Sequence, residues 1–347
     1  MRAAVFDEFG GPLEVREVPD PRPAPDGVVI RVEANGICRS DWHGWMGHDS
    51  DVRLPHVPGH EMAGVVEAVG AEVRRWQPGD RVTVPFCCGC GTCGSCRQGD
   101  LHICEDYFQP GFTAWGAFAQ RVAIRYADHN LVRLPDNLDM VTAASLGCRF
   151  ATAFRAVVHQ GQVQPGQWLV VIGCGGVGLS AVMVGLASGA RVIAVDRREA
   201  PLEIARRWGA ISVPFVDRRA TVQAVRELTD GGAHLTIDAV GSGDVGHTCI
   251  QSLRRRGRHV HVGLLLGDEF RPRVPLERVI AFELTLVGSH GMPAHHYSQM
   301  LRMVSAGQLR PTELVTARVP LSQAGDVLRS MTDFAPIGVT VIDQFDA

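Results

Sequence analysis

Four cysteines lie close together between positions 90 and 104. The run Cys90-Gly-Thr-Cys93-Gly-Ser-Cys96 is followed by Cys104, so four thiolates fall within fifteen residues. Four sulfur ligands enclose a tetrahedral zinc with no position left for water, which is the arrangement of a structural site. An iron–sulfur cluster is the alternative, but the bacterial cluster motif has three residues before its fourth cysteine and then proline. Here seven residues and then Glu105 stand in those places, so the spacing favours zinc.

A glycine-rich turn follows a short apolar run. Trp168-Leu-Val-Val-Ile172 leads into Gly173-Cys-Gly175-Gly-Val-Gly178, after which a helical pattern begins. In a dinucleotide-binding turn the first glycine permits the bend, the second lets the backbone approach a pyrophosphate, and the third lets helix and strand pack closely. Unpaired amides at the helix start favour the anion. The flanking strand and helix favour a nucleotide site over a glycine turn without ligand.

Asp196 stands eighteen residues after Gly178, at the end of the next predicted strand. A carboxylate there binds the adenosine ribose hydroxyls and repels a 2′-phosphate, so the sequence favours NAD over NADP. Arg197 and Arg198 follow directly and would soften that preference. The candidate cofactor-binding residues of this region are therefore Gly173, Gly175, Gly178, Asp196 and Arg197.

Three separate segments carry further potential metal ligands. Taken singly each is weak, because an isolated histidine or cysteine more often packs in a core than binds a metal. Their order relative to the cysteine tetrad and the glycine turn makes them informative together. The segments are Cys38-Arg-Ser-Asp-Trp-His43, Gly59-His60-Glu61 and Gly147-Cys148.

Two kinds of secondary structure must position these groups. Through about residue 135, β-branched runs alternate with Gly, Pro and Asp turns, which predicts an all-β module with long loops. From Thr142, apolar strands alternate with helical segments, which indicates βαβ units and a parallel sheet. The predicted strands of the first part are Ala3 to Phe6, Gly27 to Ala34, Gly64 to Val69, Arg81 to Pro85 and Phe118 to Ile124.

The second part begins with a helical stretch from Thr142 to His159 and includes helices after Gly178 and from Ala200 to Trp208. The arginine run 254–258 is expected to be a solvated turn. A last strand, Gly338 to Ile342, is expected to rejoin the first module. The other predicted strands are Trp168 to Ile172, Arg191 to Val195, Ile237 to Val240, His259 to Val262 and Thr285 to Gly288.

Composition removes several classes of protein. The 347 residues suggest two domains. The net charge of −3 does not indicate binding to nucleic acid or to a membrane surface. All 34 basic residues are arginine, which excludes a Schiff-base lysine, pyridoxal phosphate chemistry and a Walker A loop. Charged residues interrupt every apolar run, and the first residues lack a signal-peptide core. We therefore expect a cytoplasmic protein whose cysteines bind metal.

Together, the glycine turn, the tetrad and the three segments resemble the zinc-dependent alcohol dehydrogenases of the medium-chain dehydrogenase/reductase superfamily, over nearly the whole chain. The resemblance implies an α/β fold in which a Rossmann doubly wound parallel sheet is inserted in a GroES-like, mostly β catalytic domain. The implied domains are a GroES-like catalytic domain with a structural zinc lobe (1–149), a Rossmann NAD-binding domain (150–286) and a C-terminal segment returning to the catalytic domain (287–347).

The resemblance implies two zinc ions per chain, one structural and one catalytic. Cys38, His60 and Cys148 would be the protein ligands of the catalytic ion, with the fourth position open to water or substrate. Asp41 would hold the far nitrogen of His60. Glu61 is similar to the family's glutamate that approaches the metal from behind.

The resemblance also assigns residues to the proton and the cofactor. Ser40 and His43 look like the relay that carries the alcohol proton through the nicotinamide ribose to solvent. Arg39 would contact the pyrophosphate, while Thr152 and Val177 would press the nicotinamide ring toward the substrate.

The implied activity is hydride transfer between a primary or secondary alcohol, or its aldehyde or ketone in reverse, and NAD. An aldehyde reductase or thiol-adduct formaldehyde dehydrogenase is an alternative with the same residues and a different pocket. A non-catalytic protein that binds zinc and a nucleotide is a more distant alternative, because such a protein need not retain both the catalytic zinc ligands and the proton-relay residues. A zinc hydrolase would leave the glycine loop unexplained.

Three departures from the family and one analogy complete the expectations. Gly338-Val339 stands where relatives often have Gly-Arg, Pro201 stands where many relatives have a lysine near the adenosine ribose, and Arg149 is bulkier than the usual residue after the ligand cysteine. Chains of this size in the family are usually homotetramers. The resemblance to the family's loops implies that Trp45, Phe86, Phe112 and Trp115 are the walls of an apolar pocket for a small alcohol or aldehyde, and core packing is the alternative for each.

Overall fold

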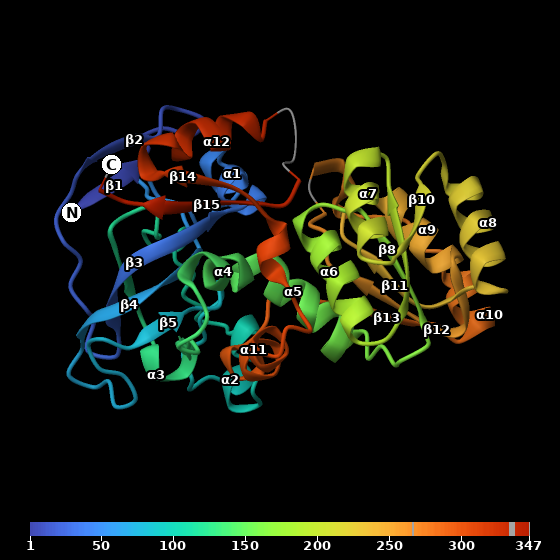
Figure 1. Ribbon diagram of the computed structural model, residues 1–347, viewed down its shortest axis with the longest axis horizontal. Helices are drawn as coiled ribbons and strands as arrows, with labels where there is room; N and C mark the ends of the chain where they lie inside the picture. Colours follow the sequence, from blue (N-terminus) through green and yellow to red (C-terminus); the bar gives the residue numbers. More distant parts are fainter. Residues whose placement is uncertain (266, 333–336, 347) are drawn as a thin grey trace. The chain divides into compact units, whose positions relative to one another are not determined.

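The computed structural model describes residues 1–265, 267–332 and 337–346 (Figure 1). The chain divides into two compact units. Unit 1 comprises Met1–Ala151 and Gly291–Ala347, and unit 2 comprises Thr152–His290. These limits lie within a few residues of the ranges 1–149, 150–286 and 287–347 expected from the sequence.

Unit 1 is built on a seven-stranded sheet with the order β14-β15-β3-β4-β5-β7, in which β6 also pairs with β3. A separate hairpin joins β1 to β2. All pairs of the larger sheet are antiparallel except β14 with β15. The strands are β1 (Arg2–Val5), β2 (Glu14–Glu17), β3 (Val28–Ile37), β4 (Glu61–Val69), β5 (Arg81–Thr83), β6 (Arg121–Ile124), β7 (Val132–Arg133), β14 (Val315–Pro320) and β15 (Val339–Gln344).

The register of β3 against β4 brings two of the candidate metal segments together. Gly36 pairs with Glu61, so the chain that leaves β3 at Ile37 runs beside the chain that enters β4. On its other side β3 pairs with β15, where Thr340 lies opposite Ile37. The expected return of the last strand to the first module is therefore confirmed.

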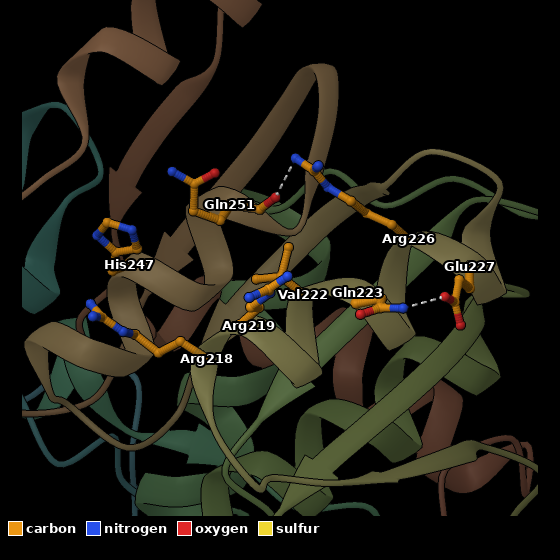
Figure 2. A pocket seen from close by; sticks show the side chains of 8 residues that line it. All are labelled: Arg218, Arg219, Val222, Gln223, Arg226, Glu227, His247 and Gln251. Atoms are coloured by element: carbon orange, nitrogen blue, oxygen red, sulfur yellow. Dashed lines mark hydrogen bonds between the residues drawn. The ribbon is translucent and has the colours of Figure 1, made fainter.

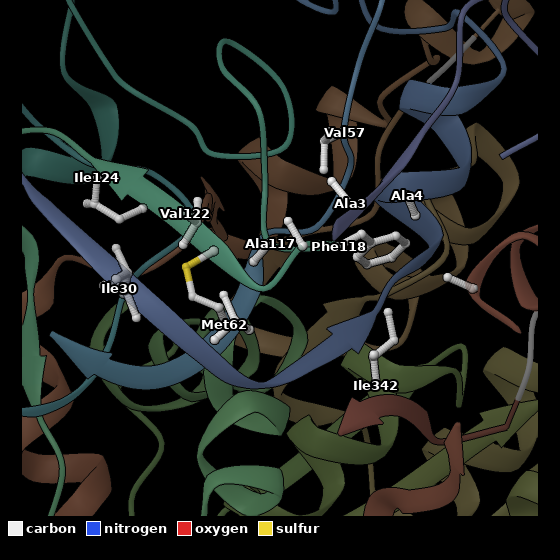
Figure 3. Packing of buried hydrophobic residues seen from close by; sticks show 14 of the residues in the cluster. Ala3, Ala4, Ile30, Val57, Met62, Ala117, Phe118, Val122, Ile124 and Ile342 are labelled. Atoms are coloured by element: carbon white, nitrogen blue, oxygen red, sulfur yellow. The ribbon is translucent and has the colours of Figure 1, made fainter. Parts of the chain in front are cut away.

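Apolar side chains between this sheet and the loops around it form the core of unit 1 (Figure 3). Ile30, Met62, Phe118, Ile124 and Ile342 are each no more than 1% exposed. Burial of such a side chain stabilises the fold by about 2 kcal/mol. The core thus holds β3 and β4 in place close to Cys38, which follows β3, and His60, which precedes β4.

Short helices and turns complete unit 1. They include α1, which follows β3 directly, and a π-helical turn, η2, which carries Cys148. The helices are α1 (Arg39–Trp45), α2 (Gly94–Arg97), α3 (Ala127–Asn130), α4 (Met140–Ser145), η2 (Leu146–Phe150), α11 (Tyr297–Ser305) and α12 (Ala324–Ser330), with 3-10 turns η1 (Leu101–Ile103), η5 (Ala294–His296), η6 (Pro311–Leu314) and η7 (Leu321–Gln323).

The helical stretch Met140–Gln160 is long and apolar enough to cross a membrane, by length and composition alone. Arg149 and Arg155 interrupt this stretch, as the sequence predicts, so its apolar run is not continuous. In the protein 83% of the apolar window is buried, as in the core helix of a globular domain. Arg149 lies within this stretch and is itself 7% exposed.

Unit 2 is a six-stranded sheet with the order β10-β9-β8-β11-β12-β13, and every pair is parallel. Chain order reverses between β8 and β11, which defines the switch point of a doubly wound Rossmann sheet. The strands are β8 (Trp168–Ile172), β9 (Arg191–Asp196), β10 (Ile211–Pro214), β11 (Ala233–Asp238), β12 (Leu253–His261) and β13 (Thr285–Gly288). The helices are α5 (Ala151–Phe154), η3 (Arg155–Gln160), α6 (Gly176–Ala187), α7 (Glu199–Arg207), α8 (Arg218–Thr229), α9 (Gly243–Gln251), η4 (Gly267–Phe270) and α10 (Leu276–Phe282).

Three details of unit 2 correct the expectations. The strand predicted at Ile237 to Val240 ends at Asp238, because that carboxylate accepts the amides of Val240 and Gly241 and starts a turn. The helix predicted after Gly178 begins earlier, at Gly176. The arginine run 254–258 belongs to β12 rather than to a turn, although a register shift interrupts its pairing with β11.

Candidate active site and metal centres

The cysteine tetrad forms a compact cluster of four sulfur atoms. The four Sγ atoms lie within 4.8 Å of one another, with 4.0 Å between Cys90 and Cys96 and 3.7 Å between Cys93 and Cys104. The hydroxyl and amide of Thr92 lower the pKa of Cys90 to about 6. All ten cysteines of the chain are free of disulfides. Four converging thiols without a disulfide fit a structural zinc.

A second cluster lies at the ends of β3 and β4. One ligand atom each from Cys38, His60, Glu61 and Cys148 lies within 4.8 Å of the others. Cys38 follows the last residue of β3, and His60 immediately precedes β4. Cys148 comes from the π-helical turn η2, a type of turn often found at functional sites. The structure thus brings together the three ligands expected from the resemblance, with the glutamate beside them.

Asp41 fixes the orientation of His60. Its Oδ1 lies 2.7 Å from Nδ1 of His60 and accepts the amide of Gly59 at 3.0 Å, while Oδ2 accepts the amide of Cys38 at 2.8 Å. Burial lowers the pKa of His60, but the Asp41 carboxylate and the Cys38 sulfur together outweigh it, and the net pKa is raised well above its ordinary value.

The far side of the His60 ring fits a cation. The histidine is fully buried, and its Nε2 has no hydrogen-bond partner among the described residues. A buried imidazole nitrogen beside two thiols, with the other nitrogen held by a carboxylate, is the donor set of a zinc site. The donors therefore fit the metal that the resemblance implies.

Glu61 is held by the segment that carries Cys148. Its Oε1 accepts the amides of Cys148 and Arg149 at 3.2 Å each, and Nε of Arg149 at 3.1 Å. Nη2 of Arg149 forms an ion pair with Oε2. Burial raises the pKa of Glu61, and the Arg149 guanidinium opposes part of that rise.

The sequence did not predict this buried ion pair. Two signals were present: an arginine directly after a ligand cysteine, and Val339 where relatives often have arginine. In the structure Nη1 of Arg149 donates to the carbonyl oxygen of Gly338 at 3.3 Å, so the guanidinium lies beside that position. One arginine thereby connects the turn η2, the glutamate and the start of β15.

Helix α1 carries the expected relay residues. The Oγ of Ser40 lies 3.8 Å from the sulfur of Cys38. Burial, with smaller effects of Arg39 and His48, lowers the pKa of His43 to about 4. The guanidinium of Arg39 stacks on the ring of Trp42 at 3.8 Å from its centroid and donates to the carbonyl of Met331.

Two of the four expected pocket aromatics lie next to His60. The ring centroids of Phe112 and Phe86 are 5.3 and 6.2 Å from that of His60. Trp45 instead packs in the core of unit 1, where its indole N–H donates to Gly11. Trp115 is 37% exposed and lines a separate hollow of about 370 Å³ with, among others, Phe108. The assignment of both tryptophans to the pocket stays a prediction.

The glycine turn of unit 2 has the form that a dinucleotide loop requires. Gly173 has a φ of 93°, and a Cβ at Gly178 would overlap the carbonyl oxygen of Gly173, so neither place suits another residue. Gly175 precedes the first residue of α6, and a Cβ there would meet nothing within 4 Å. The backbone is therefore open to a ligand at the start of a twelve-residue helix.

Asp196 ends β9 beside this turn. Its carboxylate accepts the amide of Cys174 at 2.7 Å and the amide of Arg198 at 2.8 Å. The aspartate thus braces the loop in addition to any contact with a ribose. The guanidinium of Arg197 lies over the ring of Phe215, 5.4 Å from its centroid.

The other expected cofactor residues differ in exposure. Thr152 is 7% exposed, and Val177, within the first turn of α6, is half-buried. No described contact tests their roles beside the nicotinamide, which stay predictions.

A hollow of about 610 Å³ lies over α8 and α9 of unit 2 (Figure 2). Among its lining residues Arg226 donates to the carbonyl of Gln251, and Gln223 donates to the carboxylate of Glu227. None of the candidate site residues lines this hollow. The chemistry of the chain therefore concentrates elsewhere, at the cysteine clusters and the glycine turn.

A Rossmann unit with an open glycine turn, and a mostly β unit with two thiol-rich cation sites, define a zinc-binding dehydrogenase. Residues 24–136 match the alcohol dehydrogenase GroES-like domain, and residues 176–306 match the zinc-binding dehydrogenase family.

Full-length relatives agree. The chain is 34% identical to an NAD-dependent alcohol dehydrogenase of Sulfurisphaera tokodaii, over 99% of both chains. It is 33% identical to an alcohol dehydrogenase of Geobacillus stearothermophilus, over 95% of this chain and 96% of that one. Alcohol dehydrogenase TADH from Thermus sp. ATN1 superimposes with a TM-score of 0.91 at 32% identity, covering 99% of this chain and all of that one. The chain belongs to the zinc-dependent alcohol dehydrogenase family, and the fold class expected from the sequence is confirmed.

Proposed function

We propose that this protein oxidises primary or secondary alcohols to aldehydes or ketones with NAD, and catalyses the reverse reduction. The observation that carries the proposal is the convergence of Cys38, His60 and Cys148 within one buried cluster. The NAD-dependent alcohol dehydrogenases among its full-length relatives support the reaction class. When bound, zinc lowers the pKa of an alcohol hydroxyl, and NAD accepts the hydride.

The surrounding residues prepare the metal ligands. Asp41 holds the Nδ1 side of His60, so Nε2 faces the two thiols. Phe86 and Phe112 lie against the imidazole and exclude water from that side. Apolar walls favour an aliphatic or aromatic alcohol over a sugar.

Ser40 and His43 remove the alcohol proton in this proposal. The lowered pKa of His43, caused mainly by burial, leaves its imidazole neutral at pH 7. A neutral ring has a lone pair that accepts a proton, whereas a cation has none. The ring is therefore in the neutral form, which can accept a proton, at pH 7.

The glycine turn and Asp196 are the proposed site of the NAD diphosphate and adenosine ribose. An open helix start favours the diphosphate, and the carboxylate disfavours a 2′-phosphate. Arg197 lies one residue from that carboxylate, and Arg39, Thr152 and Val177 are proposed to contact the rest of the cofactor. Residues 150–286 would thus be the NAD domain, and 1–149 with 287–347 the catalytic domain.

We further propose that the protein is a cytoplasmic homotetramer. Strand β13 is an edge strand of the unit 2 sheet, and the neighbouring helix α10 exposes Ile280 by 78% and Leu276 by 60%. Exposed apolar side chains beside an unpaired strand edge suit association with a second copy. Ten cysteines without a disulfide suit a reducing compartment.

The test measures NADH formation with a panel of primary, secondary and aromatic alcohols, together with zinc content. Cys38→Ala and His60→Ala should each abolish turnover and leave one zinc per chain, held by the tetrad. Cys249→Ala, which removes a buried thiol from the core of unit 2, is the matched control and should keep both zinc ions. Normal turnover in either ligand variant would show that the assignment is wrong, as would a wild-type protein that binds zinc and NAD without turnover.

A further inference from the structure

His48 lies directly against the proposed relay residue His43. The two Nδ1 atoms are 3.0 Å apart, which is a hydrogen bond in which one ring donates and the other accepts. His43 is half-buried and His48 is exposed. The pair therefore connects a shielded imidazole to the surface.

The end of helix α1 places His48 in this position. Gly47 has a φ of 77°, its amide donates to Gly44, and the amide of His48 donates back to the carbonyl of His43 at 3.0 Å. This is the hydrogen-bond pattern of a glycine-terminated helix. The ring of Trp42 meets both imidazoles edge-on, at centroid distances of 4.9 and 5.4 Å. Backbone and aromatic packing together fix the contact.

The charges around the pair favour outward movement of a proton. The Arg39 guanidinium repels a cation on His43, while the Cys38 sulfur favours one with a smaller effect. Two imidazoles at 3.0 Å share one excess proton, because two adjacent cations repel each other. Water stabilises the charge better on the exposed ring than on the half-buried one.

We propose that His48 is the outer member of the proton relay, receiving the proton from His43 and releasing it to water. When a proton binds Nε2 of His43, the N–H bond at its Nδ1 breaks and an N–H bond forms at Nδ1 of His48. His48 then loses a proton to water, and the pair returns to neutrality. This assignment rests on the proposed function, since it extends the relay of Ser40 and His43.

A purely structural role for His48 makes a different prediction. If the contact served only to cap α1, glutamine at position 48 would preserve it, because an amide also donates and accepts hydrogen bonds. Glutamine does not titrate, so it cannot pass a proton. His48→Gln therefore separates the two roles.

The experiment follows proton release from the zinc-loaded protein during a single turnover of alcohol and NAD, with a pH indicator in weakly buffered solution. His48→Gln should slow proton release about tenfold, a fraction of the effect of a full acid–base residue. Added imidazole should restore the rate, since a small base replaces the missing ring. His247→Gln, in α9 of unit 2, is the matched control and should match the wild type.

Two results would overturn the proposal. Wild-type proton release in His48→Gln would show that His43 passes its proton directly to water, and a slow release that imidazole does not restore would indicate a positional role. His48→Ala provides a second variant, expected to be rescued by imidazole in the same way. His43→Gln identifies a failure of the underlying function, because a relay without any part in turnover would leave that variant unaffected.

Discussion

Removal of the Arg149 guanidinium tests how the metal ligands are supported. Arg149→Met keeps an unbranched apolar stem but deletes both side-chain contacts with Glu61, a carboxylate that is fully buried. The two backbone amides that donate to Oε1 remain. The variant therefore leaves a buried charge with half of its hydrogen-bond donors.

The expected cost follows from burial. Loss of one partner of a buried ion pair costs about 3–5 kcal/mol, and the two remaining amides favour the lower end, about 3 kcal/mol at pH 7. Without the guanidinium the pKa of Glu61 should rise further above its already raised value. The carboxyl then binds a proton in the folded state as pH falls, so the destabilisation of the variant should shrink toward acidic pH.

Urea unfolding of the zinc-loaded protein, followed by tryptophan fluorescence, measures this cost. Glu61→Gln combined with Arg149→Met should recover part of the loss, because no unpaired charge remains. Arg31→Met is the matched control: it breaks an ion pair with Glu33 in which the two side chains are 50% and 31% exposed, and should cost at most about 1 kcal/mol. Equal costs for the two arginine variants, or no recovery in the double variant, would refute the reasoning.

Three further outcomes are expected. Asp196→Ala should narrow the preference for NAD over NADP by about tenfold in kcat/KM, a change of about 1.4 kcal/mol, and an unchanged ratio would exclude this carboxylate from cofactor selection. Burial lowers the pKa of His259 to about 3, so the unfolded chain binds a proton below pH 6.5 that the folded chain does not. Stability should then fall by about 2 kcal/mol between pH 7 and pH 5, and urea unfolding of His259→Gln at both pH values should lack this loss. Ile280→Asp should shift the sedimentation coefficient toward the monomer, and an unaltered wild-type oligomer would exclude α10 from the interface.

The sequence predicts the nucleotide-binding unit well because its signals are local. An apolar run bounded by glycine identifies β8 with its observed limits, Trp168–Ile172, and β13 is found in the same way at Thr285–Gly288. The limits of β11 and the arginine strand β12 were not predicted. In both, the outcome depends on contacts across the sheet, where a carboxylate turns the chain at Asp238 and a register shift accommodates 254–257.

The candidate site shows the same difference between features with a local sequence signal and features that depend on contacts between distant residues. Ligand types and their order identify Cys38, His60 and Cys148 through a family resemblance, but no spacing rule predicts that residues so far apart in sequence converge. Their meeting depends on the register of β3 with β4 and on the π-helical turn η2. The contact of Arg149 with Glu61 was missed for the same reason. The contact of His48 with His43 was missed because it depends on the backbone path at the end of α1.

The place of β15 beside β3 sets an order for assembly. Unit 2 contains all its strands between Thr152 and His290, so the residues of its sheet are synthesised before those of β15. The end of β3 next to Cys38 pairs on this edge with residues 340–342, which come later in the chain. A chain that stops before residue 340 would therefore lack the pairing that covers the end of β3 next to Cys38.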